Sequence, residues 1–222
     1  MAFAFAVEDA FKLAKAGKEG DSRKYEVNAY IDIMGDKLKV YQKYKVTLKK
    51  LNSDGSYIEE SQALEGKIEF QGNESAMPSG SKDTITYDKR GRVTKEDKGA
   101  TSEEGDDEGA RLTQLGMFYF PEEDVKVGSK WEIKIDGKES RKTVDTKHSF
   151  EVISKATVGG MDTAKIKFTA TEAKGAAPAE MSGTIWIELK SGDLVKQEAS
   201  FKGVPLSGMA VDGNFTMNVE GL

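Results

Sequence analysis

Residues 24–33 read KYEVNAYIDI, and this stretch decides the fold class because its side chains alternate in character. The odd-numbered residues are apolar or aromatic, whereas most of the even-numbered residues are charged or polar. A period of two residues places one set on each face of a β-strand, so the stretch predicts a half-buried strand. Gly35-Asp36 then supplies a turn, and the alternation resumes in residues 37–49. The two runs together predict a β-hairpin.

Similar runs, separated by turn residues, continue to the end of the chain. They predict further strands at residues 57–70, 84–87, 93–96 and 131–135, around Phe150, and at 166–168, 185–189, 195–201 and 215–219.

Helical spacing is confined to two short segments. In residues 7–17, apolar side chains recur at helical intervals and Gly17 supplies a stop, which predicts an amphipathic helix. Leu112, Leu115 and Met117 predict one further helical turn. The expected fold is therefore an all-β chain with one N-terminal amphipathic helix.

Composition excludes several classes of protein. The 222 residues include no cysteine, and 38 acidic residues against 33 basic ones give a net charge of −5. Disulfides, thiolate metal sites and a thiol nucleophile are excluded, and the acidity argues against a nucleic-acid-binding protein. The apolar runs are all shorter than the roughly 18 residues that span a bilayer, so we expect no membrane-spanning segment.

Two halves of the chain resemble each other. The segment beginning at Tyr25 and the one beginning at Trp131 match at the same offset that relates Tyr44 to Phe150, and residues 84–88 match residues 184–188. This predicts two related antiparallel meanders that form a curved sheet, a half-barrel or a sandwich. The predicted organisation is an N-terminal segment and helix (1–19), a first β repeat (20–97), an acidic linker and aromatic junction (98–121) and a second β repeat (122–222).

A resemblance to known proteins lies at the start of the second repeat. Residues 120–131 read FPEEDVKVGSKW, with a proline followed by Val-x-Val-Gly-x-x-Trp, and a Ser-Gly-Asp-Leu turn follows at residues 191–194. This pattern resembles a family of bacterial exported proteins and lipoproteins of unknown function. The resemblance implies a cell-envelope address and a curved antiparallel sheet similar to the half-barrels of lipoprotein carriers. It carries over no catalytic residues to this sequence. The chain lacks the anchoring cysteine of the lipoprotein members.

The first six residues are apolar and end in Ala4-Phe5-Ala6, a pattern that precedes signal-peptidase cleavage. The segment is either a remnant of an export signal or a short strand available for pairing.

Residues capable of catalysis or metal binding are few. His148 is the only histidine, and in its predicted strand Ser149 points to the opposite face, so the two form no local catalytic pair. The acidic run 103–108 lacks the residue order of a calcium loop and is expected to be a solvated linker. Ser79 to Lys82 fits Ser-x-x-Lys but lies in a Gly/Pro-containing loop. We therefore predict no catalytic, cofactor or metal site.

A row of lysines occupies one face of the second predicted strand. Its members are Lys37, Lys39, Lys43, Lys45 and Lys49. The row forms either a face for an anionic ligand or a solvent face whose charges pair with Glu59, Ser61 and Glu65 of the returning strand.

The aromatic residues give two further expectations. Trp131 shares a face with Ile133 and is expected to be a core anchor together with Phe118 and Phe120. Trp186 has the opposite parity to its isoleucine neighbours, so it is expected to face solvent, a groove or a ligand.

These observations predict a non-catalytic, exported cell-envelope protein, periplasmic or extracellular, that binds an apolar or lipid-like ligand. The alternative is a structural, self-assembling surface or fibre subunit that pairs with a neighbouring subunit by strand addition, and a carboxylate hydrolase is a distant third. The expected partner is a lipid-like ligand or an envelope protein. No cofactor and no nucleic acid are expected as partners.

Overall fold

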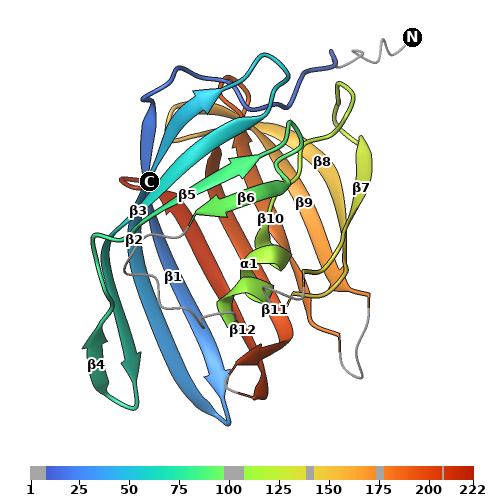
Figure 1. The fold of residues 1–222 in the computed structure, drawn as a ribbon. Coiled ribbons are helices and arrows are strands. Elements are labelled where there is room, and N and C mark those ends of the chain that lie inside the picture. The colour runs from blue at the N-terminus through green and yellow to red at the C-terminus, as the bar shows by residue number, and fades with distance from the viewer. Residues whose placement is uncertain (1–8, 98–107, 139–142, 174–177, 207) are drawn as a thin grey trace.

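The computed structural model describes residues 9–97, 108–138, 143–173, 178–206 and 208–222 (Figure 1). Residues 1–6 and most of the acidic run 103–108 lie outside the described residues, so the expectations for them stay predictions.

Strands dominate the structure, and one helix is present in the described part of the chain. The elements are β1 (Ser22–Ile33), β2 (Asp36–Leu51), β3 (Tyr57–Phe70), β4 (Asn73–Ala76), β5 (Lys82–Tyr87), β6 (Val93–Asp97), α1 (Glu108–Gly116), β7 (Lys130–Ile135), β8 (Thr146–Val158), β9 (Met161–Glu172), β10 (Glu180–Glu188), β11 (Leu194–Leu206) and β12 (Met209–Val219).

All strands belong to one open, antiparallel, 12-stranded sheet in the order β6-β5-β3-β2-β1-β12-β11-β10-β9-β8-β7, with β4 paired to β3. The sheet curves around α1, which lies on its concave side (Figure 1). The prediction of an all-β fold with a curved antiparallel sheet is confirmed, and of the predicted shapes the half-barrel fits.

The predicted N-terminal helix is wrong in position. Residues 9–18 are not helical, and Phe11 instead forms a two-way backbone bridge with Val125, with N···O distances of 2.7 and 2.9 Å. Ala16 donates a further backbone hydrogen bond to Ser191. A helix of this length is marginal by itself, and the bridges offer its backbone groups partners elsewhere in the fold. The described helix is α1, at the helical turn predicted around Leu115.

The two meanders correspond in strand order and in register. Tyr25 pairs with Tyr44 in the first, and Trp131 pairs with Phe150 at the matching place in the second. A register shift follows Thr86 in β5, and one follows the aligned residue in β10. These features agree with the predicted duplication, which itself stays a prediction. β12 has no counterpart in the first half, and its pairing with β1 joins the two halves.

The core lies mainly on the concave face of the second half. Its fully buried members include Val152, Ile166, Phe168, Ile185, Ile187, Val195 and Phe201 from the sheet and Leu115 from α1. α1 packs on β9, β10 and β11, so it supplies the second layer of this core.

An aromatic segment, residues 118–120, connects the two halves beside α1. The indole Nε1 of Trp131 donates a hydrogen bond of 2.9 Å to the Tyr119 carbonyl, and its ring stacks on Phe150 at a centroid distance of 5.1 Å. The Phe118 ring meets both of these rings edge-on. Phe120 is buried, and its backbone N–H donates to the carbonyl of Arg90 in the first half. The structure therefore brings Trp131, Phe118 and Phe120 together at the junction.

Replacing Trp131 with alanine should lower the free energy of unfolding by about 3 kcal/mol, because it removes a large packed aromatic and leaves a cavity. Urea denaturation followed by circular dichroism measures the change. Ile153→Ala is the control, because Ile153 is 41% exposed and its loss should change stability by less than about 0.5 kcal/mol. A loss below about 1 kcal/mol for Trp131→Ala would contradict the anchor role.

Candidate functional site

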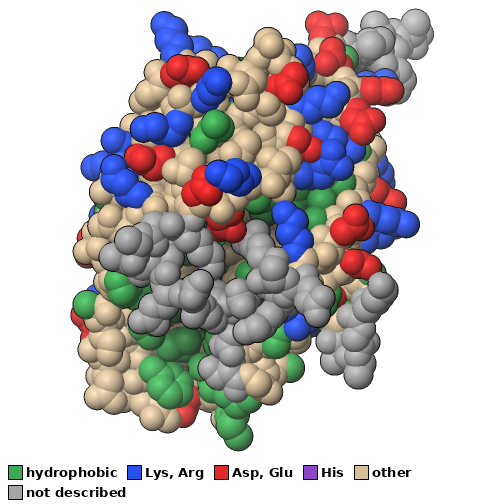
Figure 2. All heavy atoms as spheres, viewed as in Figure 1, with side chains coloured by type: hydrophobic (Ala, Val, Ile, Leu, Met, Phe, Trp, Pro, Cys, Tyr) green, Lys and Arg blue, Asp and Glu red, His purple; other side chains and the backbone are tan. Residues whose placement is uncertain are grey.

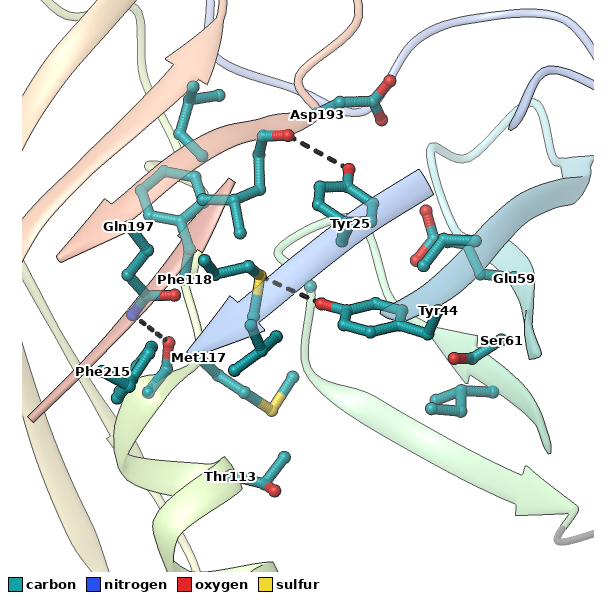
Figure 3. Close-up of a pocket in the computed structure, with 18 of the residues that line it drawn as sticks. Tyr25, Tyr44, Glu59, Ser61, Thr113, Met117, Phe118, Asp193, Gln197 and Phe215 are labelled. Carbon is teal, nitrogen blue, oxygen red and sulfur yellow. Dashed lines mark hydrogen bonds between the residues drawn. The ribbon is translucent and has the colours of Figure 1, made fainter. Parts of the chain in front are cut away.

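A cavity of about 570 Å³ lies between α1 and the concave face of the first half (Figure 3). Its wall is mainly apolar and aromatic. The residues that form it include Val27, Ala29 and Ile31 of β1, Val40, Tyr44 and Val46 of β2, Tyr57 of β3, Ile85 and Tyr87 of β5, Leu112 and Met117 beside or within α1, and Phe118, Phe120, Phe215 and Met217.

The cavity exists because α1 is fixed to the second half. Arg111 of α1 forms a bidentate ion pair with Glu172 of β9, with 2.7 Å between Arg111 Nε and Glu172 Oε1. Glu172 is 3% exposed and also accepts a hydrogen bond from the Ala179 N–H. At the other end of the helix, Gln197 Nε2 donates to the Gly116 carbonyl at 2.9 Å. α1 is therefore held over β9–β11 and reaches the first half only with one side.

A cluster of ion pairs closes one end of the cavity. Lys15 Nζ lies 2.5 Å from a Glu59 oxygen and also contacts Asp193, while Arg23 pairs with Asp193 at 2.8 Å and with Glu188. Burial opposes the charged form of Lys15, but the attraction of Glu59 and Asp193 outweighs it and raises the pKa of Lys15. The lysine therefore stays protonated, and the cluster of two cations and three carboxylates carries one net negative charge.

Four tyrosines line the cavity as two stacked pairs. Tyr25 stacks on Tyr44 at 5.3 Å, and Tyr57 stacks on Tyr87 at 4.8 Å. The Tyr25 hydroxyl donates to the Leu194 carbonyl, and the Tyr44 hydroxyl contacts the sulfur of a methionine of β12 (Figure 3). Burial raises the pKa of all four phenols, so they are neutral hydrogen-bond donors at physiological pH.

The lysine row lies on the opposite, convex side of β2, since Val40, Tyr44 and Val46 face the cavity. Lys39 pairs with Glu69, Lys43 with Glu26 and Glu220, and Lys49 with Glu60, while Lys37 is exposed and Lys45 half-buried. On the face shown in Figure 2, basic and acidic side chains are likewise interspersed. The paired solvent face is therefore the better interpretation of the row.

The predicted partners of this row were partly wrong. Glu59 and Ser61 line the cavity instead of facing the lysines. The reason is a register shift, in which Lys43 pairs with Glu65 but the next residue, Tyr44, pairs with Ala63. One extra residue in β3 reverses the alternation of side chains on its two sides.

Trp186 lies outside the cavity. Ile187, its neighbour in β10, lines the cavity, so the Trp186 ring is on the other face of the sheet. Lys165 and Lys196 cover that ring at 5.3 and 5.1 Å from its centroid, and the residue is only 8% exposed. The cation–π contacts, and no groove, account for an aromatic residue at this position.

His148 is a core residue. It is fully buried, its Nε2 lies 3.0 Å from Thr146 Oγ1, and its ring packs edge-on against Tyr119. Its Nδ1 has no hydrogen-bond partner among the residues that the structure describes, and burial lowers the pKa of His148 to about 4. The Ser149 hydroxyl donates to Glu132, so Ser149 and His148 form no hydrogen-bonded pair. Within the described ranges, no three His, Asp or Glu side chains are grouped to hold a metal ion.

The sequence analysis did not predict the ionic cluster that closes one end of the cavity or the stacked tyrosine pairs that line it. The ionic cluster joins residues from three distant segments, and no local pattern links Lys15 to Glu59 and Asp193. Tyr25, Tyr44 and Tyr87 carried a signal, because each alternates in step with apolar residues of its predicted strand. Tyr57 did not, because it shares parity with Glu59 and Ser61.

Comparison with known proteins identifies no family. No protein-family model and no curated protein matches the sequence. Among solved structures, a predicted lipoprotein from Parabacteroides distasonis is 14% identical, aligns over 96% of this chain and 99% of its own, and has a TM-score of 0.38. A DUF1329 family protein from Desulfovibrio piger is 14% identical over 91% of this chain and 88% of its own, with a TM-score of 0.28. In the described part of the chain, no helix has the length and apolarity to cross a bilayer.

Replacing Glu172 with glutamine should lower the free energy of unfolding by about 3 kcal/mol, because it leaves the Arg111 guanidinium without its buried counter-charge. Urea denaturation at neutral pH measures this loss. Glu180→Gln is the matched control, because Glu180 is exposed at the start of β10. Equal stability of the two variants would contradict the role of the ion pair in holding α1.

The buried His148 should make stability depend on pH between about 4 and 6.5. In this window the unfolded chain binds a proton at His148 and the folded chain does not, so stability falls as the pH is lowered. The loss attributable to this residue reaches at most about 3 kcal/mol near pH 4. Comparing the pH dependence of the unfolding free energy with that of His148→Gln isolates it from the carboxylates, and parallel curves would refute the assignment.

Proposed function

We propose that this protein is a non-catalytic binding module of the cell envelope whose cavity holds an apolar, lipid-like ligand. The observation that carries the proposal is the apolar cavity on the concave face of the first half. A volume of about 570 Å³ lies within the range of roughly 300–1,000 Å³ typical of small-molecule sites. The cell-envelope address rests on the resemblance of residues 120–131 to exported proteins.

The wall of the cavity suits an apolar molecule. Val27, Ala29 and Ile31 present alternate residues of β1 to it, and α1 contributes Leu112 from the other side. Removing such surfaces from water by filling the cavity with an apolar ligand is favourable, at roughly 25 cal/mol for each Å² buried. A protein that folded only for stability would gain by filling this space with its own side chains.

Hydrolysis is poorly supported by the same site. The carboxylates that reach the cavity, Glu59 and Asp193, are both held by Lys15. A glycosidase-type mechanism needs one carboxyl group that is protonated and a second that is free to act as base or nucleophile. Ion-paired carboxylates supply neither role.

Strand addition is also less well supported. The terminal strands of the sheet are short and carry charged residues, including Lys130 and Lys134 in β7 and Lys95 and Asp97 in β6. Charged, short edge strands are a common means of preventing pairing with other chains.

The test is binding of N-phenylnaphthylamine, a dye whose fluorescence rises in apolar surroundings. Ala29→Trp should weaken dye binding at least about tenfold, because the indole would occupy the cavity that the dye needs. Tyr30→Trp is the matched control, since the neighbouring Tyr30 points to the convex side and is 46% exposed. Absence of dye binding to the unmodified protein, or equal binding by the two variants, would contradict the proposal.

A further inference from the structure

The cavity wall contains uncharged polar side chains that are available for hydrogen bonds to a ligand. Gln42, Tyr57, Ser61 and Tyr87 line the cavity, and their side chains make no hydrogen bond to other residues of the described chain. Tyr25 and Tyr44 differ, because their hydroxyls have protein partners. These groups are accessible from the cavity, so a ligand that supplies a hydrogen-bond partner there can gain affinity from it.

Each charged side chain that lines the cavity in the described part of the chain takes part in an ion pair. Lys15 is bound by Glu59 and Asp193, and Asp193 is bound in addition by Arg23. An anionic ligand would meet a cluster that is already negative by one charge, and a cationic ligand would find no carboxylate without a counter-ion. A charged head group would therefore find no unpaired counter-charge among the described residues that line the cavity, and its desolvation would be offset only weakly.

We infer that the ligand is an uncharged amphiphile, with an apolar body and a hydroxyl or carbonyl group that hydrogen-bonds to the Tyr57–Tyr87 pair. This inference rests on the proposed function and names the chemical class of the ligand.

The surroundings of Tyr57 fit this role. Its ring is stacked on Tyr87, which fixes the direction of the hydroxyl. Gly91 lies beside that hydroxyl with a φ of +83°, and a Cβ there would come within 3.4 Å of the Tyr57 oxygen and 3.2 Å of the Phe118 carbonyl. The absence of a side chain lets the backbone at Gly91 lie close to both groups, which helps to hold the Tyr57 hydroxyl in place.

The test compares three amphiphiles with the same alkyl chain in their ability to displace N-phenylnaphthylamine. The three are dodecanol, dodecanoate and dodecyltrimethylammonium, each used below the concentration at which it aggregates. Dodecanol should displace the dye at a concentration about tenfold lower than either charged compound, because it buries no net charge. Displacement by a charged compound at the same or a lower concentration would overturn the inference.

Variants locate the hydrogen bond. The double variant Tyr57→Phe/Tyr87→Phe should bind dodecanol about tenfold more weakly, because it loses both hydroxyl donors and keeps the rings. Tyr30→Phe removes an exposed hydroxyl on the convex side and should bind it as the unmodified protein does. Full affinity in the double variant would overturn the assignment. Failure of the dye itself to bind would instead refute the proposed function, so the two failures are distinguishable.

Discussion

The buried ion pair between Arg111 and Glu172 determines where the single described helix lies, and the rest of the interior follows from that position. The apolar face of a sheet is stabilised when another element packs against it. In the described part of this chain, α1 packs against the concave face of the sheet. Because the ion pair and the Gln197 bond fix α1 to β9 and β11, the second half becomes a packed core. The first half, with a matching order of strands, lines the cavity with its concave face. The two halves therefore differ in how α1 packs on them, and not in their sheet geometry. The second half forms the core with α1, and the first half lines the cavity proposed to bind a ligand.

The fold could be predicted from the sequence to the extent that it depends on alternation along single strands. The alternation in residues 24–33 predicted which side chains of β1 share a face. The common offset matched Trp131 to Tyr25 and Phe150 to Tyr44, and in the structure each of these residues pairs with its fellow in the same half. The prediction failed for residues 7–17, where helical spacing was present but the backbone pairs with Val125 and Ser191. Those bonds are formed with segments far along the chain, and no local pattern contains them.

The candidate site was harder to predict because it depends on irregularities. The extra residue in β3 moves Glu59 from the solvent side to the cavity, and such a register shift is invisible to a strict period of two. The ionic cluster then forms only because Lys15 and Asp193, from two other segments, reach the same point. The expectation that Trp186 faces solvent, a groove or a ligand differs from the structure, where the residue is 8% exposed and lies outside the cavity. The alternation of side chains correctly placed Trp186 and Ile187 on opposite faces of the sheet. The lysines that cover the Trp186 ring belong to the neighbouring strands β9 and β11, and the alternation within β10 carries no information about them.

The pairing of β1 with β12 has a consequence for how the chain reaches its native state. Each meander consists of neighbouring strands, which can pair as soon as they are made, whereas the bond between the halves unites the first strand with the last. Contacts between such distant parts of a chain form slowly, because a long loop must close before they yield any stabilisation. During synthesis the edge of β1 therefore stays unpaired until β12 has been made. A truncated or stalled chain would present that edge to other chains, so the C-terminal strand completes the sheet and also ends its exposure to aggregation.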